Sequence, residues 1–118
     1  MPDNAMSRKG LRLAPIAEVT PGFAKVFDVE GQTVLLVCGE KGARAIRNLC
    51  PHAGAPLEGG RVSGNRFRCP RHGYIFDLDS GVSKRGPEEG FGPLQFLHLW
   101  EADGYYVTDG EWRDTPQT

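Results

Sequence analysis

Two short segments of the chain each contain one cysteine and one histidine. The first reads Cys50-Pro51-His52 and the second Cys69-Pro70-Arg71-His72, so sixteen residues lie between His52 and Cys69. Four potential metal ligands this far apart can share one centre only if two loops of the folded chain meet. Any fold of this chain must therefore place the two segments side by side.

The donor set favours a binuclear iron–sulfur cluster. Cys50 and Cys69 would hold one iron, and His52 and His72 would hold the other. Thiolates suit iron–sulfur units, and neutral imidazole leaves the cluster less negative than four cysteines would, so it accepts an electron more readily. Each imidazole also has a distant nitrogen that can take up a proton when the iron is reduced. A structural zinc site is the alternative, although zinc ligand pairs usually have two to four residues between them and Pro51 alone separates the first pair.

Turn residues divide the rest of the chain into short strands. The chain has 16 glycines and 9 prolines, and no window shows the apolar spacing of an amphipathic helix. We therefore expect an all-β fold, a small antiparallel sandwich or barrel with a cluster-binding subdomain of two loops. The expected hairpins are residues 23–29 with 33–38 around Glu30-Gly31, residues 61–62 with 66–68 around Ser63-Gly64-Asn65, and residues 94–100 with 105–108 around Ala102-Asp103-Gly104, while residues 42–48 and 74–78 can add two more strands.

Length and composition indicate a single domain. We expect it to span residues 11–109, with the cluster-binding part at about 49–88, between polar ends at residues 1–10 and 110–118. The net charge is −1 and basic residues are not clustered, so nucleic acid and membrane surfaces are not expected partners. There is no apolar signal core, and the odd number of cysteines, three, favours reduced thiols. Both features indicate a cytoplasmic protein.

The neighbours of the four ligands fit a cluster. Gly54 and Gly73 follow the two histidines, and we expect them to let the backbone approach the cluster and point N–H groups at sulfur. Apolar groups are expected to exclude water from the cysteine side, namely Pro51, Leu57, Pro70 and Phe76. Gly86-Pro87 is expected to form a third loop over the site.

The paired segments resemble the Rieske-type [2Fe–2S] proteins. The likeness is carried by Cys50-Pro-His-Ala-Gly-Ala-Pro-Leu-Glu-Gly-Gly60 and Cys69-Pro-Arg-His-Gly-Tyr-Ile-Phe-Asp-Leu-Asp-Ser-Gly81, and a weaker strand pattern extends it over most of residues 11–109. The resemblance implies one Rieske [2Fe–2S] cluster. It implies that Cys50 and Cys69 bind the inner iron and that His52 and His72 bind the outer, solvent-facing iron. Gly86-Pro87 resembles the family's proline loop.

Two departures place the chain near one branch of that family. Rieske subunits of respiratory complexes carry an extra cysteine in each segment, and these form a disulfide. Ala55 and Arg71 stand at those positions here. Those subunits also place a serine and a tyrosine hydroxyl near the cluster, where this chain has Tyr74 and Phe76. Fewer hydroxyl donors leave the oxidised cluster more stable. The resemblance is therefore to the low-potential branch: ferredoxins of aromatic-ring dioxygenases, small subunits of nitrite reductases and Rieske domains of oxygenases.

The remaining residues favour an electron carrier. A mononuclear oxygenase iron needs two further histidines and a carboxylate, whereas only His98 is left, and we expect it to be structural. No G-x-G-x-x-G or P-loop pattern is present for nicotinamide or flavin, and Cys38 is expected to be a buried, inert thiol. We therefore expect a ferredoxin, not an enzyme in itself, that passes electrons from a flavin-dependent or ferredoxin reductase to a terminal oxygenase or another redox enzyme. The alternatives are a nitrite reductase-type small subunit, a redox-sensing module or a zinc-stabilised interaction domain.

Overall fold

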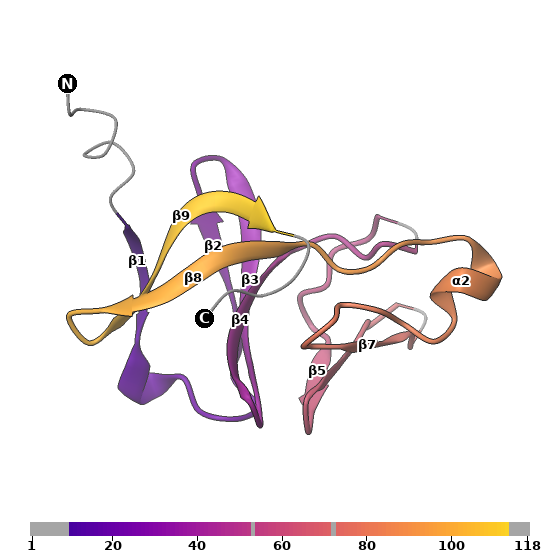
Figure 1. The fold of residues 1–118 in the computed structure, drawn as a ribbon, viewed down its shortest axis with the longest axis horizontal. Coiled ribbons are helices and arrows are strands. Elements are labelled where there is room, and N and C mark those ends of the chain that lie inside the picture. Colours follow the sequence, from indigo (N-terminus) through magenta and orange to yellow (C-terminus); the bar gives the residue numbers. More distant parts are fainter. Residues whose placement is uncertain (1–9, 53, 72, 114–118) are drawn as a thin grey trace.

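The computed structural model describes residues 10–52, 54–71 and 73–113. Within these residues the chain forms two antiparallel sheets, one of six strands and one of three (Figure 1). The elements in chain order are β1 (Leu11–Pro15), η1 (Ile16–Glu18), β2 (Ala24–Val29), β3 (Gln32–Gly39), β4 (Gly42–Arg47), β5 (Arg61–Ser63), β6 (Arg66–Arg68), β7 (Ile75–Asp77), α2 (Gly86–Glu89), β8 (Phe96–Ala102) and β9 (Tyr105–Arg113). The predicted all-β fold is confirmed.

Tight turns shape the large sheet, whose strand order is β1-β9-β8-β4-β3-β2. Between β2 and β3, Glu30 and Gly31 both have positive φ, 53° and 85°. Between β8 and β9, Asp103 and Gly104 have φ of 53° and 82°. Two successive residues with positive φ form the turn whose twist matches that of the flanking strands. Both hairpins therefore form where the sequence predicted them.

The part of the molecule that is expected to bind the metal, which we call the metal-binding half, is an insertion between two neighbouring strands. Strand β4 pairs directly with β8, with Ile46 opposite Phe96, and the Arg47 N–H donates to the Gln95 carbonyl oxygen at 2.9 Å. Residues 48–95 thus leave the large sheet and return to it at adjacent points. They contain the small sheet (order β5-β6-β7), α2 and both cysteine segments, at the opposite end of the molecule from β1 (Figure 1).

Strand β3 is buried on both faces. Its Leu35 and Val37 pack with Phe67 and Phe76 of the small sheet in one core cluster, which also includes Cys50 and Cys69. The residues that alternate with them form a second core cluster on the other face: Val34, Leu36 and Cys38 of β3, with Val29, Leu97 and Leu99 from neighbouring strands. A continuous apolar strand is typical of a sheet covered on both sides. The first core cluster therefore forms the packing interface between the large sheet and the metal-binding half.

A buried arginine fastens the small sheet to the large one. Arg44 of β4 is almost fully buried. Its Nε donates to the Leu78 carbonyl oxygen at 3.1 Å, and its Nη2 bonds the Asp79 carboxylate at 3.0 Å. Lys41 adds an ion pair of 3.1 Å to the same carboxylate. Both acceptors follow β7, so these contacts fix the position of the insertion against the sheet.

Four details differ from the sequence-based expectation. Strand β1 and the helix α2 were not predicted, and β8 begins at Phe96 rather than at residue 94. Residues 110–113, expected in a polar tail, are the end of β9. Their pairing with the start of β8, where Phe96 lies opposite Arg113 and Leu97 opposite Trp112, extends the strand. The rest of the expected ends, residues 1–9 and 114–118, lies outside the described residues.

In the described part of the chain, no helix is long and apolar enough to cross a membrane.

Candidate metal centre

The two cysteine segments are loops with the same hydrogen-bond pattern. In the first, the Cys50 N–H donates to the Ala55 carbonyl oxygen (2.7 Å), and the Gly54 N–H donates back to the Cys50 carbonyl oxygen (2.7 Å). In the second, the Cys69 N–H donates to Tyr74 (2.8 Å) and the Gly73 N–H donates to Cys69 (3.0 Å). Each cysteine thus begins a closed five-residue turn. The predicted position of both segments in loops is confirmed.

The glycines in these turns are required by backbone geometry. Gly54 has φ of +71° and Gly73 has φ of +74°, a region that other residues adopt only at a cost. Their N–H groups bond the carbonyl oxygens of Cys50 and Cys69. The expectation that these N–H groups point at sulfur is therefore wrong: each one closes its turn and so fixes the backbone of the cysteine.

Both site cysteines are buried under apolar side chains. Cys50 and Cys69 are each 1% exposed, and they share their core cluster with Leu57, Phe76 and Leu94. Two of the four residues predicted to exclude water, Leu57 and Phe76, are thus fully buried beside the thiols. The other two, Pro51 and Pro70, lie at the surface side of the loops, where Pro51 is partly buried and Pro70 exposed.

Asn48 holds the first loop in place. Its side chain is almost completely buried, and its Oδ1 accepts the N–H groups of Leu57 (2.7 Å) and Glu58 (2.9 Å). Its Nδ2 donates to the Glu58 carboxylate at 3.2 Å. This role of Asn48 was not predicted from the sequence. A polar residue between an apolar strand and the first cysteine was the only signal available.

His52 is packed among aromatic rings at the edge of the site. Its Nδ1 is buried. Its ring centroid lies 4.5 Å from that of Tyr74 and 5.3 Å from that of Phe91, and its Nε2 lies 3.5 Å from the Tyr74 hydroxyl oxygen. The two ring nitrogens therefore have different surroundings, one in the interior and one toward a phenol. His72, the fourth predicted ligand, lies outside the described residues.

The short helix α2 reaches this edge through Glu89. The Tyr74 hydroxyl donates to the Glu89 carboxylate at 2.5 Å, and Arg85 forms an ion pair with the same carboxylate at 2.7 Å. The hydrogen bond to Glu89 raises the pKa of Tyr74, and the same bond lowers the pKa of Glu89. Gly86-Pro87 therefore begins a helical turn beside the site, where the sequence predicted a third loop.

The donor chemistry fits a binuclear cluster. Two buried thiols and a buried imidazole nitrogen lie on two loops closed in the same way. Among the residues that the structure describes, no three His, Cys, Asp or Glu side chains come close enough to hold a single ion. A binuclear cluster does not need such a group, because each of its irons takes two protein ligands.

The other candidate residues lie elsewhere. Cys38 belongs to the core cluster on the other face of β3, and burial raises the pKa of its thiol. His98 Nδ1 contacts the Asp109 carboxylate at 3.0 Å, a pairing within the β8–β9 region of the large sheet. All three cysteines lie within the described ranges, and none of them forms a disulfide.

Comparisons with known proteins agree on the family. The methanesulfonate monooxygenase ferredoxin subunit of Methylosulfonomonas methylovora is 32% identical over 93 residues, which cover 78% of this chain and 73% of that protein. Apoptosis-inducing factor 3 of Mus musculus is 36% identical over 93 residues, which cover 79% of this chain. The chain spans only 13% of the length of that second relative.

Solved structures share the fold. A ferredoxin of Sphingomonas yanoikuyae B1 superposes with a TM-score of 0.73 and 26% identity, covering 87% of this chain and all of that one. The ferredoxin of carbazole 1,9a-dioxygenase from Nocardioides aromaticivorans IC177 has a TM-score of 0.74 and 27% identity, covering 87% of this chain and 99% of that one. The sequence profile described as "Rieske [2Fe-2S] domain" matches residues 10–94. The chain therefore belongs to the Rieske [2Fe–2S] domain family, and its cofactor is one [2Fe–2S] cluster.

Proposed function

We propose that Cys50, His52, Cys69 and His72 hold the cluster, the cysteines on one iron and the histidines on the other. The bound cluster supplies one-electron oxidation and reduction. The chain's own residues set its surroundings: Leu57 and the neighbouring core side chains keep water from the two thiols. The ring of His52 is only partly buried, so the histidine edge is the side nearer to solvent.

We propose that the protein is a one-electron carrier of the ferredoxin type. It accepts an electron from a flavin-dependent or ferredoxin reductase and delivers it to a terminal oxygenase or another redox enzyme. The observation that carries this proposal is the asymmetry of the site, with thiols 1% exposed and a histidine at the partly exposed edge. Electrons are expected to pass through His52 and His72. The ferredoxin subunit of a methanesulfonate monooxygenase, which this chain matches over most of its length, supports the proposal.

Docking to these partners is proposed to be transient and small in area. The surface involved would surround the histidines and the start of α2 at Gly86-Pro87. The chain carries no catalytic site of its own in this proposal, because its site residues bind the cluster and bind no substrate. Nucleic acid and membranes are not proposed as partners. We propose a cytoplasmic location, because the three cysteines, all within the described residues, form no disulfide.

The test is to isolate the protein from cells competent in cluster assembly. We expect about two irons and two acid-labile sulfides per chain, a reversible one-electron reduction, and reoxidation by an oxygenase in the presence of a ferredoxin reductase and NADH. His72→Cys should lower the reduction potential, because a thiolate adds negative charge. Colourless protein that contains zinc without sulfide would refute the proposal, as would a cluster that no reductase can reduce.

A role as a small subunit of a nitrite reductase is the alternative. A putative small subunit of that enzyme shares the fold at 18% identity, with a TM-score of 0.66. At this level of identity the likeness supports a shared fold and not a shared function. Stable co-purification with a large reductase subunit would distinguish this role from that of a free carrier.

A further inference from the structure

The outer face of the small sheet is rich in arginine. Side chains alternate along its strands, so that Phe67 and its neighbours face the core while Arg61, Arg66 and Arg68 are exposed on the opposite face. Arg71, in the loop after β6, is exposed as well. We call Arg61, Arg66, Arg68 and Arg71 the arginine face. It lies in the metal-binding half and flanks Cys69 on both sides in sequence.

The arginine face contains a pair of like charges in direct opposition. Arg61 of β5 is the cross-strand partner of Arg68 of β6. Like charges placed opposite each other on one face destabilise a sheet. Among the described residues, none of the four arginines takes part in an ion pair. Arg66 has Asp77 as its cross-strand neighbour, whereas Arg61, Arg68 and Arg71 carry positive charge that no ion pair within the described ranges neutralises.

Four of the five acidic groups of residues 48–95 have partners elsewhere, the exception being Glu88 of α2. Glu58 accepts a hydrogen bond from Asn48, and Asp77 accepts the N–H groups of the turn that follows β7. Asp79 binds Arg44, and Glu89 binds Arg85. If one of these four carboxylates paired with the arginine face, it would have to give up its present contact. A negative group from another molecule could pair with the face without breaking any of these contacts.

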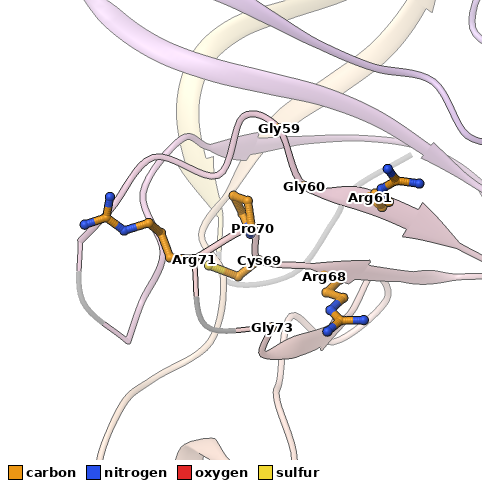
Figure 2. A pocket seen from close by; sticks show the side chains of 8 residues that line it. All are labelled: Gly59, Gly60, Arg61, Arg68, Cys69, Pro70, Arg71 and Gly73. Carbon is orange, nitrogen blue, oxygen red and sulfur yellow. The ribbon is translucent and has the colours of Figure 1, made fainter.

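Three of the four arginines, Arg61, Arg68 and Arg71, border an open groove of about 470 Å³ beside Cys69. Figure 2 shows the side chains of Arg61 and Arg68 on one side of Cys69 and Pro70, and that of Arg71 on the other. Glycines line the groove between them. A Cβ at Gly73 would lie 3.1 Å from Arg68 Nη2, so the absence of a side chain there leaves space for the guanidinium. The groove combines cationic walls with exposed backbone.

Apolar side chains continue the surface on the next strand. Ile75 of β7 is the cross-strand partner of Arg68, and it is 48% exposed. Val82, 46% exposed, lines a second groove together with Ile75. Gly73 borders both grooves. Arginine is enriched at protein–protein interfaces, and adjoining exposed apolar side chains with a polar rim mark interaction sites.

We infer that the arginine face, with Ile75 and Val82, is the docking site for a carboxylate-rich surface of a redox partner protein. The inference rests on the proposed electron-carrier function, and it specifies that the docking surface of the partner is negatively charged. This site lies beside Cys69 and adjoins the docking surface proposed above, because Tyr74 lines the second groove with Ile75 and its ring centroid lies 4.5 Å from that of His52. Nucleic acid is disfavoured as the occupant, because the whole chain has a net charge of −1 and such binding needs a large basic footprint.

The test uses the oxidised holoprotein and a labelled peptide of eight glutamates and two leucines. Its control peptide has glutamine at every glutamate position. We expect the acidic peptide alone to bind, more weakly as salt rises. Arg68→Glu with Arg71→Glu should reduce the affinity by about tenfold or more. Lys25→Glu on β2 is the matched control for the single variant Arg61→Glu, because each replaces one positive charge by one negative charge. Lys25→Glu should leave peptide binding nearly unchanged.

Arg61→Glu supplies a readout that a purely structural arginine would not give. It should weaken peptide binding and at the same time raise the urea midpoint of the free protein, because an opposite-charge pair replaces the Arg61–Arg68 repulsion. Equal loss of binding in Arg61→Glu and Lys25→Glu would overturn the inference, since net charge alone would then explain it. Binding of a single-stranded RNA in place of the peptide would also overturn it. Reversible reduction of the cluster, measured separately, tests the proposed function and is independent of these outcomes.

Discussion

Asn48 is the residue on which the first cluster loop depends most. Its Oδ1 accepts two backbone N–H groups, those of Leu57 and Glu58. In Asn48→Ala the N–H of the buried Leu57 loses its acceptor, which costs about 1–3 kcal/mol. Water can reach the N–H of the exposed Glu58, so the loss of that bond costs only about 1 kcal/mol. We expect a total of about 2–4 kcal/mol.

The assay is anaerobic urea unfolding of the holoprotein, followed by the visible absorbance of the cluster. With a urea dependence of about 1–3 kcal/mol per molar, the midpoint of Asn48→Ala should fall by about 0.7 M or more. Asn48→Asp keeps the acceptor but repels Glu58, and adding Glu58→Gln should restore most of the midpoint. The matched control is Asn65→Ala, which removes a 3.4 Å bond from the Lys41 N–H and a side-chain hydrogen bond to Asp79, both away from the first cluster loop. A midpoint of Asn48→Ala within about 0.2 M of the parent protein would refute the reasoning.

Two further predictions concern contacts that hold the insertion to the large sheet. The hydrogen bond from Lys41 lowers the pKa of Asp79, so Asp79 stabilises the fold above its ordinary pKa and loses that contribution as the pH falls through the lowered value. Asp79→Asn should therefore flatten the acid side of a plot of urea midpoint against pH, by an amount that corresponds to about 1 kcal/mol or less, because the ion pair is half-exposed. An unchanged slope would contradict this. Gly81 has φ of +79°, and a Cβ there would lie 2.9 Å from the Phe96 ring, so Gly81→Ala should cost about 1–3 kcal/mol in thermal or urea unfolding. Gly92→Ala, where a Cβ meets nothing within 4 Å, should be close to neutral, and equal effects of the two alanines would show that the close approach does not matter.

The parts of the fold that the sequence predicted are those encoded locally. Glu30-Gly31 and Asp103-Gly104 specify their turns by their own backbone preferences, so the flanking hairpins could be read without knowing the rest of the fold. The cysteine–histidine segments were identifiable for a similar reason, because ligand type and spacing are local. The packing of Leu57 and Phe76 beside the thiols could be predicted because both follow closely on a cysteine segment.

Other features depend on contacts that no local pattern records. Strand β1 exists because Leu11–Pro15 pairs with β9, nearly a hundred residues away in the chain. Helix α2 has only four residues and no apolar stripe; its sole signals are a proline at its start and Gly90, with φ of 80°, at its end. Asn48 acts through side-chain bonds to residues nine and ten positions later. The role of the Gly54 N–H was mistaken because sequence shows that a glycine is needed, but not where its N–H points.

The short distance between the Arg47 N–H and the Gln95 carbonyl oxygen has a consequence for how such chains can vary. The chain leaves the large sheet after β4 and returns to it at β8, and these two points are adjacent. Residues 48–95 therefore form a self-contained insertion, here called the cassette, between the paired strands β4 and β8. Lengthening, shortening or exchanging the cassette need not change the register of the six strands. Any substitute must still cover Leu35, Val37 and Ile46, which the cassette now shields from water. Grafting experiments should therefore join the new segment after Arg47 and before Phe96, and the graft should keep those three side chains buried.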